Sequence, residues 1–357
     1  KAMLSRVQDT VHVSVCVSVD DVCDQVHTSD ALRATEWVGV SDDGEDLLRQ
    51  KVAQLDWVTS GSDGKVTWSM VVCDDGCQTA WSMPNGTQGV GSGKMIETIA
   101  REELSDKRIS VVYLADGIRD HHPVCAGMSD VSESSKGGAL QYAMQMALDQ
   151  YDEMQKSLKH VVVYTDADLS THMGQVGLLV EPVIGSSAVV GVGSAWHAKS
   201  VGLDVGQEPG VVDKLTMFFW KQLFPEIGHV VDTQICLRGM DAEMCRRMLS
   251  PTPLERGSGF DVELLMRTTE LEDTTIHNVS ICWHTGSSDS LVDLVKGFSR
   301  IYRSLLLKPD TWRDSMALFM DDLDAQSLST LIANCPDGIS SKDGVDFASY
   351  RDVPADD

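Results

Sequence analysis

Short apolar runs rich in valine alternate with helix-like segments along the first half of this chain. The runs lie at residues 11–19, 66–73, 109–115 and 160–168, and the segments with helical spacing lie at 42–58, 94–104 and 136–158. A strand that is buried on both faces reads as a continuous apolar run. Strands that alternate with helices are typical of a parallel sheet. The sequence therefore predicts an α/β fold, Rossmann-like, with a mainly parallel sheet flanked by helices.

The second half of the chain continues the pattern less regularly. Further strands are predicted at 188–196, 230–237 and 277–285, and further helices at 174–184, 211–224, 241–249 and 260–271. A helical segment follows residue 287, and we find neither an internal repeat nor a low-complexity linker. We therefore predict one globular domain over residues 1–290 and a helical C-terminal extension over residues 291–357.

The composition narrows the classes of partner. The 357 residues carry a formal net charge of −25, which repels nucleic-acid phosphates and anionic lipids. The nine cysteines are odd in number and form no CxxC pair, as expected for reduced thiols in the cytoplasm. We see no signal-peptide pattern and no apolar run near the roughly 20 residues of a membrane helix. The sequence predicts a soluble protein that binds no nucleic acid and has no transmembrane segment.

Acidic residues follow two of the predicted strands. Asp74 and Asp75 end the second strand, and Asp166 and Asp168 end the fourth. Ligands of open α/β sheets bind at the carboxyl ends of strands, so both acidic ends are expected to face one crevice. Residues two apart in a strand point to the same side, and Mg²⁺ or Mn²⁺ prefers oxygen ligands. A lone Asp-x-Asp is more often a solvated acidic turn, so its neighbours decide between the two interpretations.

Three further segments favour a nucleotide site. S-S-K-G-G-A-L (134–140) places two glycines and Lys136 at a helix start, which suits an anion. A plain loop-to-helix junction would show the same sequence pattern. V-D-T-Q-I-C-L-R-G (231–239) offers polar groups near a strand. G-S-G-F-D-V-E-L-L-M (257–266) carries two acids on a first helical turn, where they are also good helix starters.

Together these segments resemble the family 2 glycosyltransferases with the A-type nucleotide-sugar-binding fold. The resemblance is closest to the branch of polyprenyl-phosphate and dolichyl-phosphate glucosyl- and mannosyltransferases. That branch has D-D-G, K-G-G-A, D-A-D-x-S/T, D-T-Q-C-G-F-K and F-D-x-E-L in this order. The chain has D-D-G, K-G-G-A, D-A-D-L-S, D-T-Q-I-C-L-R and F-D-V-E-L in the same order, over about residues 11–290.

The resemblance implies a role for each matching residue. Asp74 and Asp75 would hold the base or ribose, Lys136 and Gly137 would lie near the nucleotide, Asp166 would contact ribose or sugar, and Asp168 would bind the metal on the diphosphate, with Asp166 beside it. Asp232, Thr233 and Gln234 would line the sugar and acceptor region. Asp261 or Glu263 would be the catalytic base, with Asp166 the third catalytic residue. His284 would complete the metal shell, unless it is an ordinary hydrogen-bonded histidine at a strand end.

Two departures from the family pattern bear on the acceptor. I-C-L-R-G replaces C-G-F-K, and the membrane helices of the lipid-linked enzymes are missing, so we expect a soluble or phosphorylated acceptor. The predicted function is a Mg²⁺- or Mn²⁺-dependent hexosyltransferase that uses a UDP- or GDP-sugar, with inversion implied by the resemblance. The alternatives are a non-catalytic nucleotide-sugar-binding scaffold and a sugar-phosphate nucleotidyltransferase. The long segments before Asp74 and Lys136 leave a homodimer contact open.

Overall fold

The computed structural model describes residues 1–19, 47–77, 91–154, 158–186, 189–203, 211–250, 255–271, 273–284, 291–305 and 310–334. Its strands are β1 (Val11–Val19), β2 (Val66–Asp74), β3 (Ile109–Tyr113), β4 (Lys159–Thr165), β5 (Val189–Ser194), β6 (Val201–Gly202), β7 (Leu237–Asp241), β8 (Thr275–Ser280) and β9 (Cys282–Trp283). Its α-helices are α2 (Leu47–Thr59), α3 (Ser92–Thr98), α4 (Leu114–Arg119), α5 (Gly137–Glu153), α6 (Val176–Gly185), α7 (Val211–Leu223), α8 (Ala242–Leu249), α9 (Phe260–Thr269), α10 (Leu291–Ser304), α11 (Thr311–Asp322) and α12 (Ala325–Ala333).

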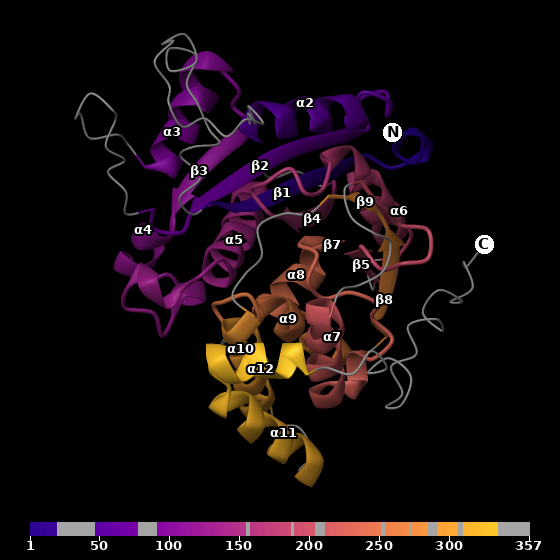
Figure 1. Cartoon of the computed structure of the whole chain (residues 1–357). Coiled ribbons are helices and arrows are strands. Elements are labelled where there is room, and N and C mark those ends of the chain that lie inside the picture. The colour runs from indigo at the N-terminus through magenta and orange to yellow at the C-terminus, as the bar shows by residue number, and fades with distance from the viewer. Residues whose placement is uncertain are drawn as a thin grey trace.

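Seven strands form one sheet in the order β3-β2-β1-β4-β7-β5-β8, and β6 pairs with β9 separately. Every neighbouring pair in the large sheet is parallel except β4–β7 and β7–β5, so β7 alone runs against the others. Helices lie on both sides of this sheet (Figure 1). The predicted mainly parallel sheet flanked by helices is confirmed.

The two faces of the sheet bury separate apolar clusters. On β1, Val13, Val15 and Val17 contribute to the cluster that contains residues of α2, α3 and α6. Cys16, on the opposite face of the same strand, contributes to the cluster that contains residues of α5, α7 and α9. Side chains alternate between the two faces of a strand, and both faces of β1 are buried. On the face of Cys16, the polar side chains of His12 and Ser14 are buried as well and contact polar side chains of the neighbouring strands.

The C-terminal helices pack against the second half of the sheet domain. Helix α10 contacts α7, α9 and α11, and α12 contacts α7 (Figure 1). Val295, Phe298 and Ile301 of α10 are buried in the same cluster as α5. The predicted division at residue 290 stays a prediction. Among the described residues, no helix combines the length and the apolar character that crossing a bilayer requires.

Two predicted strands are wrong in their bounds. The strand predicted at 230–237 is a turn up to Ile235, and β7 begins at Leu237, because the Asp232 carboxylate accepts hydrogen bonds from the backbone N–H groups of Gln234 and Ile235. The third strand ends at Tyr113, and Leu114 already begins α4. Apolar character alone did not separate a buried strand from a buried helical turn. The start of the helix predicted at 42–58 (residues 42–46) and the tail after residue 334 lie outside the described residues.

A buried histidine makes the fold sensitive to acid. His160 is 4% exposed, its Nε2 is 2.8 Å from Ser14 Oγ, and its ring stacks on Tyr151 at 4.0 Å. Burial, with smaller effects of His12 and Arg246, lowers the pKa of His160 to about 3. The pKa of a histidine in an unfolded chain is ~6.5. At a pH between the native and the unfolded pKa, the unfolded chain therefore binds a proton at this residue that the native chain does not. The stabilising effect of neutral His160 is therefore complete above that range and is lost as the pH falls.

We expect the free energy of unfolding to fall below pH ~6.5 by up to about 1.4 kcal/mol per pH unit from this group alone. Urea unfolding at about pH 7.5 and about pH 5 measures the fall. His160→Leu removes the titrating group and should show a shallower dependence on pH, even if it is less stable at neutral pH. Equal pH dependence in the variant and the wild type would contradict the expectation.

Candidate functional site

The two acidic strand ends lie at one edge of the sheet. β2 and β4 run parallel to β1 on either side of it, with Asp74 opposite Val19 and Thr165 opposite Val17. β7 runs the other way, so its first residue, Leu237, lies opposite Thr165 at the same edge. The segment before β7 therefore reaches the edge where β2 and β4 end. The parallel strands β2 and β4 and the antiparallel strand β7 thus bring three of the predicted site segments together.

Lys136, the residue before α5, joins the two acidic ends. Its Nζ lies 2.6 Å from Asp166 Oδ1, and its backbone N donates to Asp75 Oδ2 at 2.5 Å. The Lys136 and Asp166 side chains are 20% and 30% exposed, so the pair is open to solvent. The convergence of D-D-G, K-G-G and D-A-D that the sequence led us to expect is present. One lysine and two carboxylates from three elements meet at this edge.

The backbone of Lys136 is strained. Its φ is 86° and its ψ is −54°, a region that residues with a side chain rarely adopt. Such a conformation costs on the order of 1–3 kcal/mol and persists only where its surroundings hold it. Here the Asp75 carboxylate holds the backbone and Asp166 holds the side chain. In this backbone conformation, the Lys136 side chain reaches Asp166 at the strand ends.

Gly137 is required by a close approach of two backbones. A Cβ at this position would lie 2.6 Å from the carbonyl oxygen of Gly257 and 2.8 Å from the carbonyl carbon of Arg256. The backbone N of Gly138 donates to the Arg256 carbonyl at 3.1 Å, which fixes the approach. A side chain here would push the start of α5 away from the segment before α9.

We expect Gly137→Ala to lower the free energy of unfolding by about 1–3 kcal/mol, the usual cost of overpacking. Gly185→Ala is a matched control, because a Cβ there meets nothing within 4 Å. Urea unfolding of the two variants measures the difference. Two variants of equal stability would show that the α5 start can yield without cost.

Asp74 and Asp75 are both 6% exposed, and their carboxylates accept hydrogen bonds from backbone N–H groups. Asp74 Oδ1 accepts from the N–H groups of Gly76 and Cys77 at 2.9 and 3.0 Å, and its Oδ2 accepts from Gly93 N at 2.8 Å. These bonds make Asp74 the organiser of the turn after β2. Its role as a ligand of the base or ribose, and that of Asp75, stay predictions.

The turn after β4 presents Asp166 and Asp168 half-buried at the edge. Asp168 Oδ1 accepts from the backbone N of Ser170 at 3.1 Å and from its Oγ at 2.5 Å. The Ser170 carbonyl in turn accepts from His284 N at 3.0 Å, and Thr171 pairs with Trp283. The structure therefore places His284 beside the Asp-Ala-Asp turn through its backbone.

The metal set of Asp166, Asp168 and His284 is not assembled as three converging side chains. Within the described stretches, no three histidine, cysteine or acidic side chains are grouped so as to hold a cation. Mg²⁺ and Mn²⁺ take few protein ligands and fill their shells with phosphate and water. The carboxylate oxygens of Asp166 and Asp168 are the ligand type that such a cation prefers, and both their convergence on one cation and the three-ligand set stay predictions.

Asp261 lies in a buried network beneath the edge. It is 3% exposed, and its Oδ1 accepts from Tyr164 Oη at 2.7 Å and from the Arg238 guanidinium. Burial raises the pKa of Asp261, against the opposing effects of Arg238, Lys136 and Tyr164. Tyr164 directly precedes Thr165, the last residue of β4, so this network lies next to the edge. The carboxylate is engaged by both partners, and its assignment as the catalytic base stays a prediction.

Glu263 is also buried, and both oxygens of its carboxylate accept hydrogen bonds. It is 1% exposed, its Oε2 accepts from Glu255 N at 2.7 Å, and its Oε1 accepts from Arg267 Nε and Nη2 at 3.1 and 2.8 Å. The Oε2 contact ties α9 to the segment before it, whereas the Oε1 contact with Arg267 lies within α9. Its assignment as a base stays a prediction without support from these contacts.

Two buried residues and one exposed residue form the segment of Asp232, Thr233 and Gln234. Asp232 Oδ2 accepts from Ala195 N at 2.9 Å, which joins the turn to the end of β5. Thr233 is 1% exposed, and its carbonyl accepts from Arg238. Gln234 is exposed, and its Nε2 donates to Thr233 Oγ1 at 2.8 Å. Of the three, Gln234 presents its side chain to solvent.

Sequence reasoning missed Lys51, which lies beneath the Asp-Ala-Asp turn. It is 2% exposed on α2, and its Nζ donates to the Asp168 carbonyl at 2.7 Å. A signal was present: Lys51 occupies an apolar position of the helical pattern, with Leu47, Leu48 and Leu55. A charged residue on an apolar helix face indicates a buried partner.

No protein-family model matches the chain, and no curated protein matches it. Solved structures of glucosyl-3-phosphoglycerate synthase from Mycobacterium tuberculosis do match, one of them in complex with Mn²⁺, uridine diphosphate and glucosyl-3-phosphoglycerate. That structure is 17% identical, covers 86% of this chain and 83% of its own, and has a TM-score of 0.49. A structure described as a mycobacterial protein is 16% identical, covers 87% and 78%, and has a TM-score of 0.49. Similarity at this level assigns no activity, ligand or residue role to this chain.

Proposed function

We propose that this protein is a metal-dependent glycosyltransferase of the A-type fold, which transfers a sugar from a UDP- or GDP-linked donor. The observation that carries the proposal is Lys136, which pairs with Asp166 and holds Asp75 at the common edge of β2 and β4. A lysine at a helix start suits a diphosphate, and carboxylates beside it suit the diphosphate's metal. The place, at the carboxyl ends of parallel strands, is where such sheets bind ligands.

Asp166 and Asp168 would hold Mg²⁺ or Mn²⁺, with His284 as a third ligand. When bound, the metal would neutralise the negative charge that develops on the departing diphosphate. Lys136 neutralises Asp166 in the structure described here, and a diphosphate would compete with Asp166 for its ammonium group. Ser170 holds the Asp168 carboxylate in one orientation through its N–H and hydroxyl.

The proposal gives different roles to the three candidate catalytic carboxylates. Asp166 is half-buried at the edge and is our candidate for direct contact with the sugar. Asp261 would position Tyr164 and Arg238 beneath the donor, since its carboxylate is engaged by both. Glu263 would hold α9 in place. An acceptor that is already an anion would need no base at all.

From the sequence alone we also propose kinship with the polyprenyl-phosphate branch and inversion at the anomeric carbon. The same source suggests a soluble or phosphorylated acceptor, a homodimer and a cytoplasmic location. His284 at the metal would favour retention, so the anomeric configuration of the product decides between that ligand and the inversion implied by the resemblance.

Product analysis tests the proposal. The protein is incubated with UDP- and GDP-hexoses, Mn²⁺ and a panel of hydroxyl and phosphorylated acceptors. Free nucleoside diphosphate together with a glycosylated acceptor would support the transferase. Release of pyrophosphate in the presence of a sugar phosphate and a nucleoside triphosphate would identify a nucleotidyltransferase instead. Binding of the donor without any product would identify a nucleotide-sugar-binding protein.

A further inference from the structure

A lysine buried beneath the Asp-Ala-Asp turn has no role in the proposal above. Lys51 lies on the inner face of α2 among Leu47, Leu48 and Leu55, and it is 2% exposed. Burying an ammonium group costs several kcal/mol unless hydrogen bonds or charges compensate, so such a lysine is retained where its contacts matter. Its contacts reach a segment more than a hundred residues away in the sequence.

The Lys51 ammonium group fixes the backbone of a candidate metal ligand. Its Nζ donates to the Asp168 carbonyl oxygen at 2.7 Å. The Asp168 carboxylate is held separately by Ser170. Lys51 also lines a small apolar cavity together with Ala167, the residue between the two aspartates. The charge therefore lies directly under the turn that presents Asp166 and Asp168.

A second side chain on the same helix holds the far end of this loop. Gln54, about one turn after Lys51, accepts a hydrogen bond from Met173 N through its Oε1 at 2.8 Å. Between these two points lies His172, whose pKa is lowered by burial and, secondly, by the charge of Lys51. Helix α2 thus contacts the 168–173 loop at both ends.

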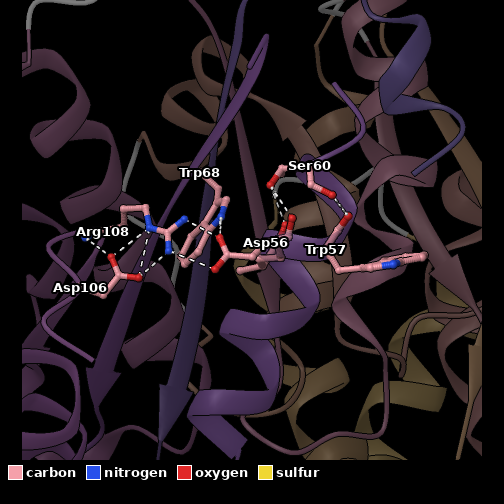
Figure 2. Close-up of polar contacts among 8 residues, drawn as sticks. Asp56, Trp57, Ser60, Trp68, Asp106 and Arg108 are labelled. Carbon is pink, nitrogen blue, oxygen red and sulfur yellow. Dashed lines mark hydrogen bonds and ion pairs between the residues drawn. The ribbon is translucent and has the colours of Figure 1, made fainter. Parts of the chain in front are cut away.

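Helix α2 is itself anchored away from the loop. Figure 2 shows Arg108 between the carboxylates of Asp56 and Asp106, with Trp68 Nε1 donating to Asp56 Oδ1 at 3.1 Å. The Arg108 guanidinium also lies 3.9 Å from the centre of the Trp68 ring. These contacts tie α2 to β2 and to the start of β3. The helix is a fixed support from which Lys51 and Gln54 reach the loop.

We propose that Lys51 is a positioning residue that fixes the Asp168 backbone, and with it the carboxylates of Asp166 and Asp168, for a divalent cation. The positive charge beneath the turn also offsets the repulsion between the two carboxylates when no cation is bound. Gln54 assists by holding Met173. The metal role of the two aspartates rests on the proposed function, whereas the support of the loop by α2 does not.

Lys51→Met tests the inference, because it keeps the length of the side chain and removes its charge and donor. We expect the Kd for Mn²⁺, measured by electron paramagnetic resonance with UDP present, to rise about 10–100-fold, as for other residues that orient metal ligands. We also expect faster hydrogen exchange of the amides of residues 169–173. Lys51→Arg should restore a large part of both, and Gln54→Ala should speed exchange near Met173.

Gln50→Ala is the matched control, since Gln50 lies on the same helix and is exposed. It should leave the melting temperature, the Kd for Mn²⁺ and the exchange of 169–173 unchanged. Unchanged Mn²⁺ affinity and exchange in Lys51→Met would overturn the inference and leave the proposed function standing. A wild type that binds no Mn²⁺ would overturn the metal role, and the exchange data would still decide whether Lys51 holds the loop. If Lys51→Met does not fold, unchanged exchange in Gln54→Ala would overturn the two-point support.

Discussion

Asp168→Ala is expected to reduce turnover about 10²–10³-fold, which corresponds to roughly 3–4 kcal/mol of activation free energy. The variant keeps Asp166 and Lys136 but removes the carboxylate that would bear most directly on the diphosphate's metal. Its stability should change little, because Asp168 is half-buried and, among the described residues, its carboxylate bonds within its own turn. Steady-state rates with a UDP- or GDP-sugar measure the loss, and thermal melting checks the fold.

Asp120→Ala is a suitable control for that measurement. Asp120 lies after α4 and pairs at the surface with Arg119. Its removal should leave turnover and its dependence on Mn²⁺ unchanged. An Asp168→Ala protein with full turnover would show that the turn after β4 does not hold the metal.

Asp261→Ala is expected to have the largest effect on stability, a loss of about 3–5 kcal/mol. The substitution leaves the Arg238 guanidinium, which is 1% exposed, without its carboxylate and removes the acceptor of Tyr164 Oη. A charge left buried without its ion-pair partner costs far more than a lost surface pair. Urea unfolding at neutral pH measures the loss.

A double substitution separates the ion pair from other effects of Asp261. Asp261→Leu with Arg238→Met replaces both charges by apolar groups and should recover most of the stability lost in Asp261→Ala. If Asp261→Ala were as stable as the wild type, the carboxylate would not be paired with Arg238. Asp261 would then again be free to act as a base.

The sheet could be predicted because its first four strands are valine-rich runs. β1 spans the predicted residues, and β2 and β4 begin and end within one to three residues of their predictions. The strand predicted at 230–237 failed because Asp232 caps its own turn through Gln234 and Ile235. Whether this segment forms a strand or a turn depends on side-chain hydrogen bonds that compete with strand pairing. The apolar periodicity of a sequence carries no information about those hydrogen bonds.

The candidate site was predictable where topology alone decides it. The ends of parallel strands meet at one edge, so Asp75 and Asp166 had to lie near one another, with Lys136 between them. The engagement of Asp261 by Arg238 could not be foreseen, because one residue lies on α9 and the other on β7 and only the tertiary fold brings them together. Lys51 was hidden for the same reason, since its acceptor is a backbone carbonyl on a distant loop.

Binding of the donor is the most direct test of a nucleotide-sugar site at this edge. Calorimetric titration of UDP- and GDP-hexoses should show binding that requires Mn²⁺ or Mg²⁺ and that weakens about tenfold in Lys136→Ala, as expected for a lost charged hydrogen bond. Donor binding of equal strength with and without the metal, and in wild type and Lys136→Ala, would contradict the account.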